Sequence, residues 1–147
     1  MKPSQRWSRI VELVAQEYPH AVVESEGALR FVLVTREPDP VRVGIRVRRI
    51  MLFGHEVVAI AADLGHAAHT DASSALALNA LLVHGTLIVE DGVLYSRALV
   101  ALDDDTIARF DPRVRLLALE AAALKRRNRT PRAAVSSVSS AVAHFSD

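Results

Sequence analysis

The 147-residue sequence lacks cysteine altogether, which excludes disulfide bridges, thiol nucleophiles and cysteine-ligated zinc sites. Aromatic residues make up only 5% of the chain, so a hydrophobic core has to be built mainly from Val, Leu, Ile and Ala. An excess of charge of one sign is missing as well. The formal net charge of +1 favours neither nucleic acid nor a membrane surface, and only a local cluster of charges would do so.

Long apolar runs and glycine-rich segments are also missing. No stretch approaches the roughly 18 consecutive apolar residues of a membrane-spanning helix. The glycines are isolated from one another, which excludes a glycine-rich phosphate loop. The first turns of the chain contain Glu12 and Glu17 and lack the apolar segment of a signal peptide. We therefore expect a cytoplasmic protein that binds no membrane.

The chain has enough apolar residues for a core, since 50% of it is hydrophobic and 24% is charged. The mean hydropathy of +0.19 is high for a soluble chain of this size and indicates apolar surface left over for a partner. From residue 128 onward the composition changes to Arg, Thr, Pro, Ser and Ala. We therefore expect one domain over 1–127 and a flexible basic, Ser- and Ala-rich tail over 128–147.

The first half of the chain predicts a helix followed by strands. Apolar residues at helical spacing predict a helix over 4–18, which Pro19 ends. Runs rich in β-branched residues predict strands over 21–26, 28–35, 41–48 and 56–62. The strand over 56–62 is apolar on both faces, which is typical of a strand at the centre of a sheet. A loop is expected over 65–70.

The strand over 41–48 has the clearest pattern in the sequence. Apolar residues alternate in it with arginines and one glycine, in the order Val41, Arg42, Val43, Gly44, Ile45, Arg46, Val47 and Arg48. A period of two residues predicts a strand with one buried apolar face and one solvated, positively charged face.

The second half predicts a helix, a hairpin and a last helix. The helix over 71–83 is apolar nearly all round, and Gly85 is expected to end it. Strands over 86–90 and 93–101 flank the sequence Asp91-Gly92, which strongly favours a hairpin turn. Acidic residues over 103–105 suit the start of a helix over 106–127, which we expect to loosen at Pro112.

This order of elements favours an α+β fold, with an antiparallel sheet of about five strands and three helices. From Ala75 onward the sequence reads ALALNALLVHGTLIVEDGVLYSRALVALDD. This block is a helix with a Leu-Asn step, then a hairpin, then an apolar-Leu-Asp segment before the last helix. It resembles the type III secretion chaperone-like fold, shared by the dimeric secretion chaperones and the YbjN-type sensory transduction regulators. The resemblance covers about 4–127 and implies a homodimer, no cofactor, and protein binding in place of catalysis.

Two histidines, His66 and His69, are the only weak candidates for a metal site, with Asp63 and Asp71 flanking them. The pair lacks the intervening Glu of the HExxH motif, and no distant third ligand is marked. The alternative is a polar loop that caps the following helix. Because the sequence also contains no nucleophile elbow, we expect neither a metal site nor an enzyme.

The helix over 71–83 is the candidate dimer interface, because it carries more apolar surface than one buried face can use. The interface residues we expect are Ala72, Ala75, Leu76, Asn79, Leu82 and Val83. Asn79 has two interpretations. It is either a hydrogen-bonded amide of the core or a polar residue that fixes helix pairing across the dimer.

Five arginines form a candidate site for a partner or an anion, namely Arg42, Arg46, Arg48, Arg126 and Arg127. They have three interpretations: solvated surface charge, a site for an acidic protein partner, or a nucleic-acid site. Few aromatic residues are available to stack on bases, which disfavours nucleic acid without excluding it.

The sequence therefore predicts a non-catalytic protein-binding module, a homodimeric chaperone-like or regulatory domain that binds a polypeptide partner. The alternative is a regulator that binds nucleic acid or an acidic partner through the basic strand and tail. A metal-dependent enzyme at His66 and His69 is a remote third hypothesis.

Overall fold

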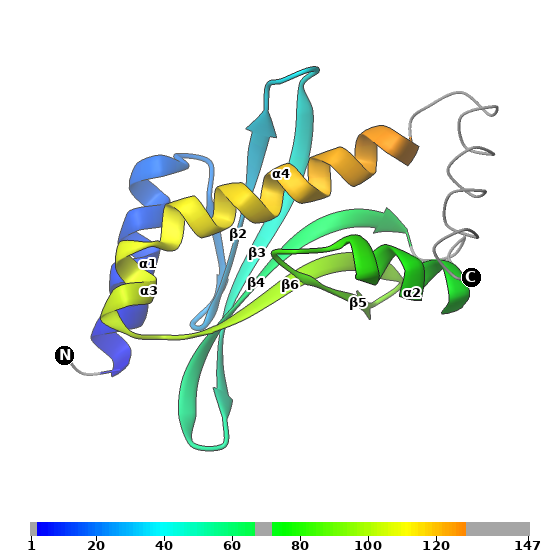
Figure 1. Ribbon diagram of the computed structural model, residues 1–147. Helices are drawn as coiled ribbons and strands as arrows, with labels where there is room; N and C mark the ends of the chain where they lie inside the picture. The colour runs from blue at the N-terminus through cyan, green and yellow to red at the C-terminus, as the bar shows by residue number, and fades with distance from the viewer. Residues whose placement is uncertain (1–2, 67–71, 129–147) are drawn as a thin grey trace.

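The computed structural model describes residues 3–66 and 72–128, which form four helices and six strands (Figure 1). In chain order the elements are α1 (Pro3–Glu17), β1 (Val22–Ser25), β2 (Ala28–Thr35), β3 (Val41–Leu52), β4 (His55–His66), α2 (Ala72–Leu81), β5 (Thr86–Glu90), β6 (Val93–Ala101), α3 (Asp104–Ala108) and α4 (Phe110–Asn128). The α+β class is confirmed, with six strands where about five were expected and with α3 as a short additional helix. The expected tail beyond Asn128 and part of the loop over 65–70 lie outside the described residues.

The strands form one sheet in the order β1-β2-β3-β4-β6-β5, and every neighbouring pair is antiparallel. Strands that are consecutive in the chain lie side by side, except that β4 pairs with β6. The chain leaves the sheet there to form α2 and returns as β5. The central place of the doubly apolar strand is confirmed, and the β5–β6 hairpin has the expected bounds.

The alternation along β3 separates the two faces of the sheet. Val43, Ile45 and Val47 are buried on the side of α4, whereas Arg42 and Arg48 are exposed on the other side. Figure 1 shows α4 crossing the buried face diagonally, and α4 contacts β2, β3, β4 and β6 there. The predicted division of this strand into an apolar and a basic face is confirmed.

The core lies between this face of the sheet, α4 and α1. α4 turns small, fully buried residues toward the strands, namely Ala118, Ala121 and Ala122, and these let its backbone approach the sheet closely. Trp7 of α1 is buried at the other end, and its indole Nε1 donates to the backbone oxygen of Glu26 at 3.0 Å. Aliphatic packing therefore makes up for the scarcity of aromatic residues.

Tyr18 ties the end of α1 to α4. Its ring stacks on Phe31 with 4.2 Å between ring centroids, and its hydroxyl donates to Asp111 Oδ1 at 2.9 Å. Burial, and after it the hydrogen bond with Asp111, raises the pKa of Tyr18 above its ordinary value. This contact fixes the turn between α1 and β1 beside the outer edge of β2.

The last helix is broken earlier than expected. Asp103 caps α3, and its Oδ1 accepts a hydrogen bond from the Thr106 nitrogen at 2.8 Å. The chain leaves helical geometry at Arg109 and starts α4 at Phe110, so the break precedes Pro112. Proline has no amide hydrogen, and its ring clashes with the carbonyl four residues earlier in a continuous helix. Placing Pro112 in the first turn of a new helix avoids both costs.

Four further bounds differ from the expected ones. β3 and β4 pair with each other as far as Leu52 and His55, so both strands extend beyond 48 and 56 into a hairpin. β4 also continues to His66, because Gly65, expected in a loop, pairs with β6 after a bulge. α2 ends at Leu81 and not at residue 83.

Candidate functional site

The face of the sheet opposite α4, called here the open face, is covered by none of the described helices. Its side chains come from the residues that alternate with the buried ones on β2, β3, β4 and β6. On β2 this face contains Arg30 and two exposed valines, Val32 and Val34, which are 46% and 45% exposed. The open face therefore combines apolar surface with arginine side chains.

Cross-strand pairing sets a row of arginines across the open face. Arg30 of β2 is the partner of Arg46 of β3, Arg46 is the partner of Ala61 of β4, and Ala61 is the partner of Arg97 of β6. Partnered residues of antiparallel strands point to the same side of a sheet. The row thus has an alanine between two arginines.

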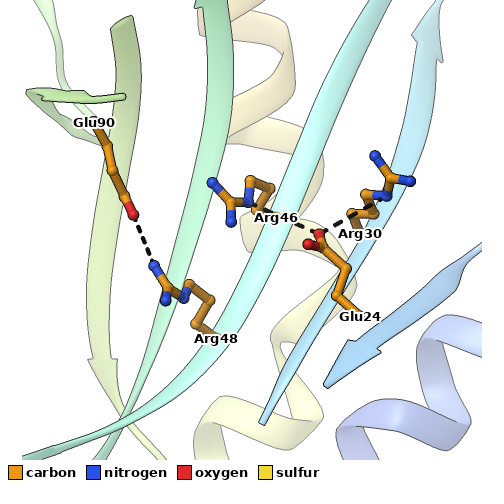
Figure 2. A network of polar contacts seen from close by, with 5 residues as sticks. All are labelled: Glu24, Arg30, Arg46, Arg48 and Glu90. Atoms are coloured by element: carbon orange, nitrogen blue, oxygen red, sulfur yellow. Dashed lines mark hydrogen bonds and ion pairs between the residues drawn. The ribbon is translucent and has the colours of Figure 1, made fainter. Parts of the chain in front are cut away.

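Acidic residues from the two outer strands partly neutralise these arginines, as Figure 2 shows. Glu24 of β1 lies 3.8 Å from Arg30 Nε and 3.9 Å from Arg46 Nε. Glu90 of β5 pairs with Arg48 at 2.9 Å. In the same view the terminal nitrogens of Arg46 point away from Glu24 and toward β4. The face is basic but is interspersed with carboxylates.

Tyr95 of β6 holds Arg46 in place. The Arg46 guanidinium carbon lies 5.9 Å from the centroid of the Tyr95 ring, within the range of a cation–π contact. A hydrogen bond with Tyr95 is the main cause that raises the pKa of Arg46 above its ordinary value. Arg46 is thereby oriented between the two hollows of the open face.

A larger hollow of about 730 Å³ lies on the β2 side of Arg46 and Tyr95. It is lined by the turn over 17–22 and by β2 and β3, including Val32, Val34 and Arg42. β1 pairs with β2 only as far as Arg30, so the remainder of the β2 edge has no neighbouring strand among the described residues. An apolar hollow beside an open strand edge is suited to an extended peptide.

A smaller hollow of about 190 Å³ lies on the β6 side of the same pair. Ala59 and Ala61 form its floor, and arginines of β3 and β6 stand around it. Arg97 lines this hollow and takes part in no ion pair within the described part of the chain. Its Nε atom is shielded from solvent and has no hydrogen-bond partner there.

Arg126, one of the two basic residues expected near the C-terminus, does not join this surface. Arg126 Nη2 donates to the backbone oxygens of Glu37 and Asp39 at 2.7 and 2.6 Å, so it fastens the β2–β3 turn to α4. The side chain of Arg127 lies outside the described residues. Of the five arginines named from the sequence, the structure brings together Arg42, Arg46 and Arg48.

The candidate dimer residues divide into two faces of α2 and the turn after it. Leu76 and Val83 are 71% and 82% exposed, whereas Leu82 packs against the core. Ala75 is half-buried, and the side chain of Ala72 lies outside the described residues. An outward apolar surface is therefore present on the single chain.

Asn79 is exposed, so its interpretation as a core amide is wrong. Its Oδ1 accepts a hydrogen bond from the Leu87 nitrogen at 2.9 Å. Because β5 is the last strand of the sheet, this bond satisfies a backbone donor on the sheet edge that would otherwise be open to another strand. A role for Asn79 across a dimer stays a prediction.

The β3–β4 hairpin ends in a second apolar surface. Met51 and Phe53 are 56% and 99% exposed, and Phe53 with Gly54 forms the turn at positive φ angles of 50° and 78°. The hairpin extends beyond the neighbouring strands, since β2 pairs with β3 only as far as Arg48 (Figure 1). The fold buries none of these apolar tip residues.

The histidines do not form a metal centre in the described part of the chain. His66 is exposed at the end of β4, and His69 lies outside the described residues. Over 3–66 and 72–128, no group of three or more His, Asp or Glu side chains is placed to hold a metal ion. The His84 backbone nitrogen is engaged by the Glu120 carboxylate of α4 at 3.2 Å.

Sequence reasoning missed Arg97, Tyr95 and Ala61 as site residues. The signal for two of them was present, because alternation along the predicted strand 93–101 sets Tyr95 and Arg97 on one face. What placed them beside Arg46 was the pairing of β4 with β6, two strands that are separated in sequence by a helix and another strand.

Comparisons with family models, with curated proteins and with solved structures found no significant match. Among the described helices, none is both long and apolar enough to span a membrane.

Proposed function

We propose that this chain is a non-catalytic protein-binding module, which holds a polypeptide partner on its open face and pairs with a second copy through α2. The observation that carries the proposal is the open face itself. It presents exposed valines, an unpaired strand edge and two hollows in one continuous surface. Exposed apolar surface bordered by charged side chains is typical of a protein interaction site.

A protein partner fits this face better than nucleic acid does. Glu24, Asp63 and Glu90 lie among the arginines of the open face, and carboxylates at these positions repel a phosphate backbone. The aromatic side chain nearest the arginines, Tyr95, is buried beneath Arg46 and offers no open surface for stacking. A polypeptide can supply apolar side chains for the valines and carboxylates for the arginines.

Selection of random peptides displayed on phage, with the full chain as the target, tests this proposal. We expect enriched sequences that lose binding to Val32→Asp, which replaces one of the two exposed valines of β2 by a charge. Leu119→Asp is the matched control, because Leu119 is an exposed leucine of α4 on the other side of the molecule. A selection that enriches nothing, or peptides that bind Val32→Asp as well as the wild type, would overturn the open face as the binding surface.

The pairing through α2 rests on the outward surface formed by Leu76 and Val83. Burying apolar surface contributes roughly 25 cal/mol per Å², so hiding such side chains in a two-fold contact favours association. Sedimentation at micromolar concentration should give a dimer for the wild type and a folded monomer for Leu76→Glu. Leu82→Glu, which charges the side that packs on the core, should unfold the domain. A monomeric wild type contradicts the homodimer.

A further inference from the structure

The residues around the smaller hollow of the open face are arranged as in an anion-binding site. β4 contributes two alanines to its floor, Ala59 and Ala61, at positions where β3 and β6 carry long side chains. Arg46 and Arg97 are the partners of Ala61 on its two sides, so their backbones are two strand spacings apart, or about 10 Å. Arginine side chains that start this far apart can meet over the alanine between them.

The charges around the hollow leave one guanidinium without a partner. Three of its four arginines have acidic partners: Arg46 pairs with Glu24, Arg48 with Glu90 and Arg49 with Glu56. Arg97 has none among the described residues, and its Nε donor is shielded from water. An oxyanion bound in the hollow would neutralise this unpaired guanidinium through its terminal nitrogens. Glu24 is shared between Arg46 and Arg30, so the row carries more positive than negative charge, and a bound carboxylate would neutralise part of this excess.

We propose that Arg97 and Arg46 bind one carboxylate of the polypeptide partner above Ala61. This inference rests on the proposed function, since it names the group by which the partner is anchored. A carboxylate suits the site better than a phosphate dianion, because Glu90 stands on the rim and repels a second negative charge. Guanidinium and carboxylate groups also form paired, charge-assisted hydrogen bonds. The carboxylate comes from an Asp or Glu side chain or from the C-terminus of the partner.

Titration of the full chain with sodium acetate tests the site without any peptide. The arginine Nε–H signals are followed by NMR at constant ionic strength, and inorganic phosphate is titrated in parallel. We expect a saturable shift of the Arg97 signal with acetate and a weaker response to phosphate. No saturable shift at Arg97, or tighter binding of phosphate than of acetate, would overturn the carboxylate site.

Two variants and one control locate the binding. Arg97→Gln removes the unpaired charge, and Ala61→Leu fills the floor of the hollow without changing the charge. Arg42→Gln is the control. It removes the same charge from the same face, but Arg42 lines only the larger hollow. Acetate should no longer shift the Arg46 signal in Arg97→Gln, and it should act as on the wild type in Arg42→Gln. Equal losses in both arginine variants would mean a diffuse charge effect and no site. Should Ala61→Leu fail to fold, the two arginine variants still decide the question.

The selected peptides separate this inference from the proposed function. Loss of a hydrogen bond to a charged group should weaken peptide binding to Arg97→Gln about ten- to hundredfold. Peptides that lose affinity on C-terminal amidation would identify the terminal carboxylate, and those that lose it on Glu→Gln or Asp→Asn substitution would identify a side chain. Peptides that bind Arg97→Gln normally but not Val32→Asp would leave the protein-binding function standing and refute the carboxylate anchor. A shift with acetate and no selected peptide would support the anion site and refute the protein-binding function.

Discussion

The two faces of the sheet are formed by the same strands but have opposite roles. On the covered face, β3 supplies Val43, Ile45 and Val47 to a core closed by α4, and each is buried. The residues that follow these three in the chain lie on the open face, and they are Gly44, Arg46 and the exposed Arg48. The covered face therefore determines whether the chain folds, and substitutions on the open face are expected to cost less stability. This separation has consequences for single substitutions.

The largest effect is expected from truncating the covered face. Ile45→Ala should lower the free energy of unfolding by about 2–5 kcal/mol, because it leaves a cavity in a fully buried site. Val32→Ala, on the open face of the neighbouring strand, should cost less than about 1 kcal/mol. Urea denaturation of both variants measures the difference. Equal losses would mean that the open face is also buried, against a partner chain that the fold requires.

Two glycines on opposite faces allow a second comparison. A Cβ atom at Gly85 would lie 2.8 Å from Leu117 Cδ1 of α4 and would overlap the Ser96 hydroxyl of β6. A Cβ atom at Gly44 would meet Asp63 at an ordinary 3.6 Å. Gly85→Ala should therefore cost about 1–3 kcal/mol through overpacking, whereas Gly44→Ala should be neutral or slightly stabilising. Thermal melting compares the two, and an unaffected Gly85→Ala variant would show that this segment can move away from β6.

Gly85 also shows how far local sequence signals reach. It was expected to end a helix, but α2 ends at Leu81, and the structure requires a glycine at 85 because the chain passes directly over β6. The strands, the hairpin at Asp91-Gly92 and the alternation along β3 could be predicted, because each depends on neighbours in sequence. A close approach between distant segments leaves no periodic signal.

Prediction of the candidate site from the sequence has the same limit. The basic face of β3 could be predicted from Arg42, Arg46 and Arg48 alone. The placement of Arg97 beside Arg46 could not, because it follows from the registers of β3 with β4 and of β4 with β6. A register shift of one residue would turn Arg97 into the core. Nor could the sequence show that Arg126 lies outside the site. A basic residue near a helix end gives the same sequence pattern whether it binds a ligand or, as here, the backbone of a turn.

Removing charge from the open face should have a small effect on stability. The triple variant Arg42→Ser, Arg46→Ser and Arg48→Ser should lose at most about 1.5 kcal/mol in total, since substitutions outside the core usually change stability by up to about 0.5 kcal/mol each. The ion pairs with Glu24 and Glu90 are partly exposed to solvent and contribute little. Urea denaturation measures this loss. A triple variant that fails to fold would show that these side chains hold the sheet together.

The smallest expected effect concerns the two hairpin turns, which have the same backbone geometry and different residues. Phe53-Gly54 and Asp91-Gly92 each occupy a two-residue turn at positive φ, near 50° and 75°. Asp and Asn tolerate this conformation, whereas a bulky side chain disfavours it. Phe53 is 99% exposed and gains no burial in return. Phe53→Asn should therefore raise the free energy of unfolding by about 0.5 kcal/mol.

Asp91→Phe is the reverse control and should lower stability by a similar amount, because it places an exposed ring in the same turn conformation. Thermal melting of both variants checks the pair. A stabilised Phe53→Asn variant would mean that the fold gains nothing from this aromatic side chain. A destabilised one would show instead that Phe53 packs within the protein, and the tip would then be part of the structure that holds the sheet together.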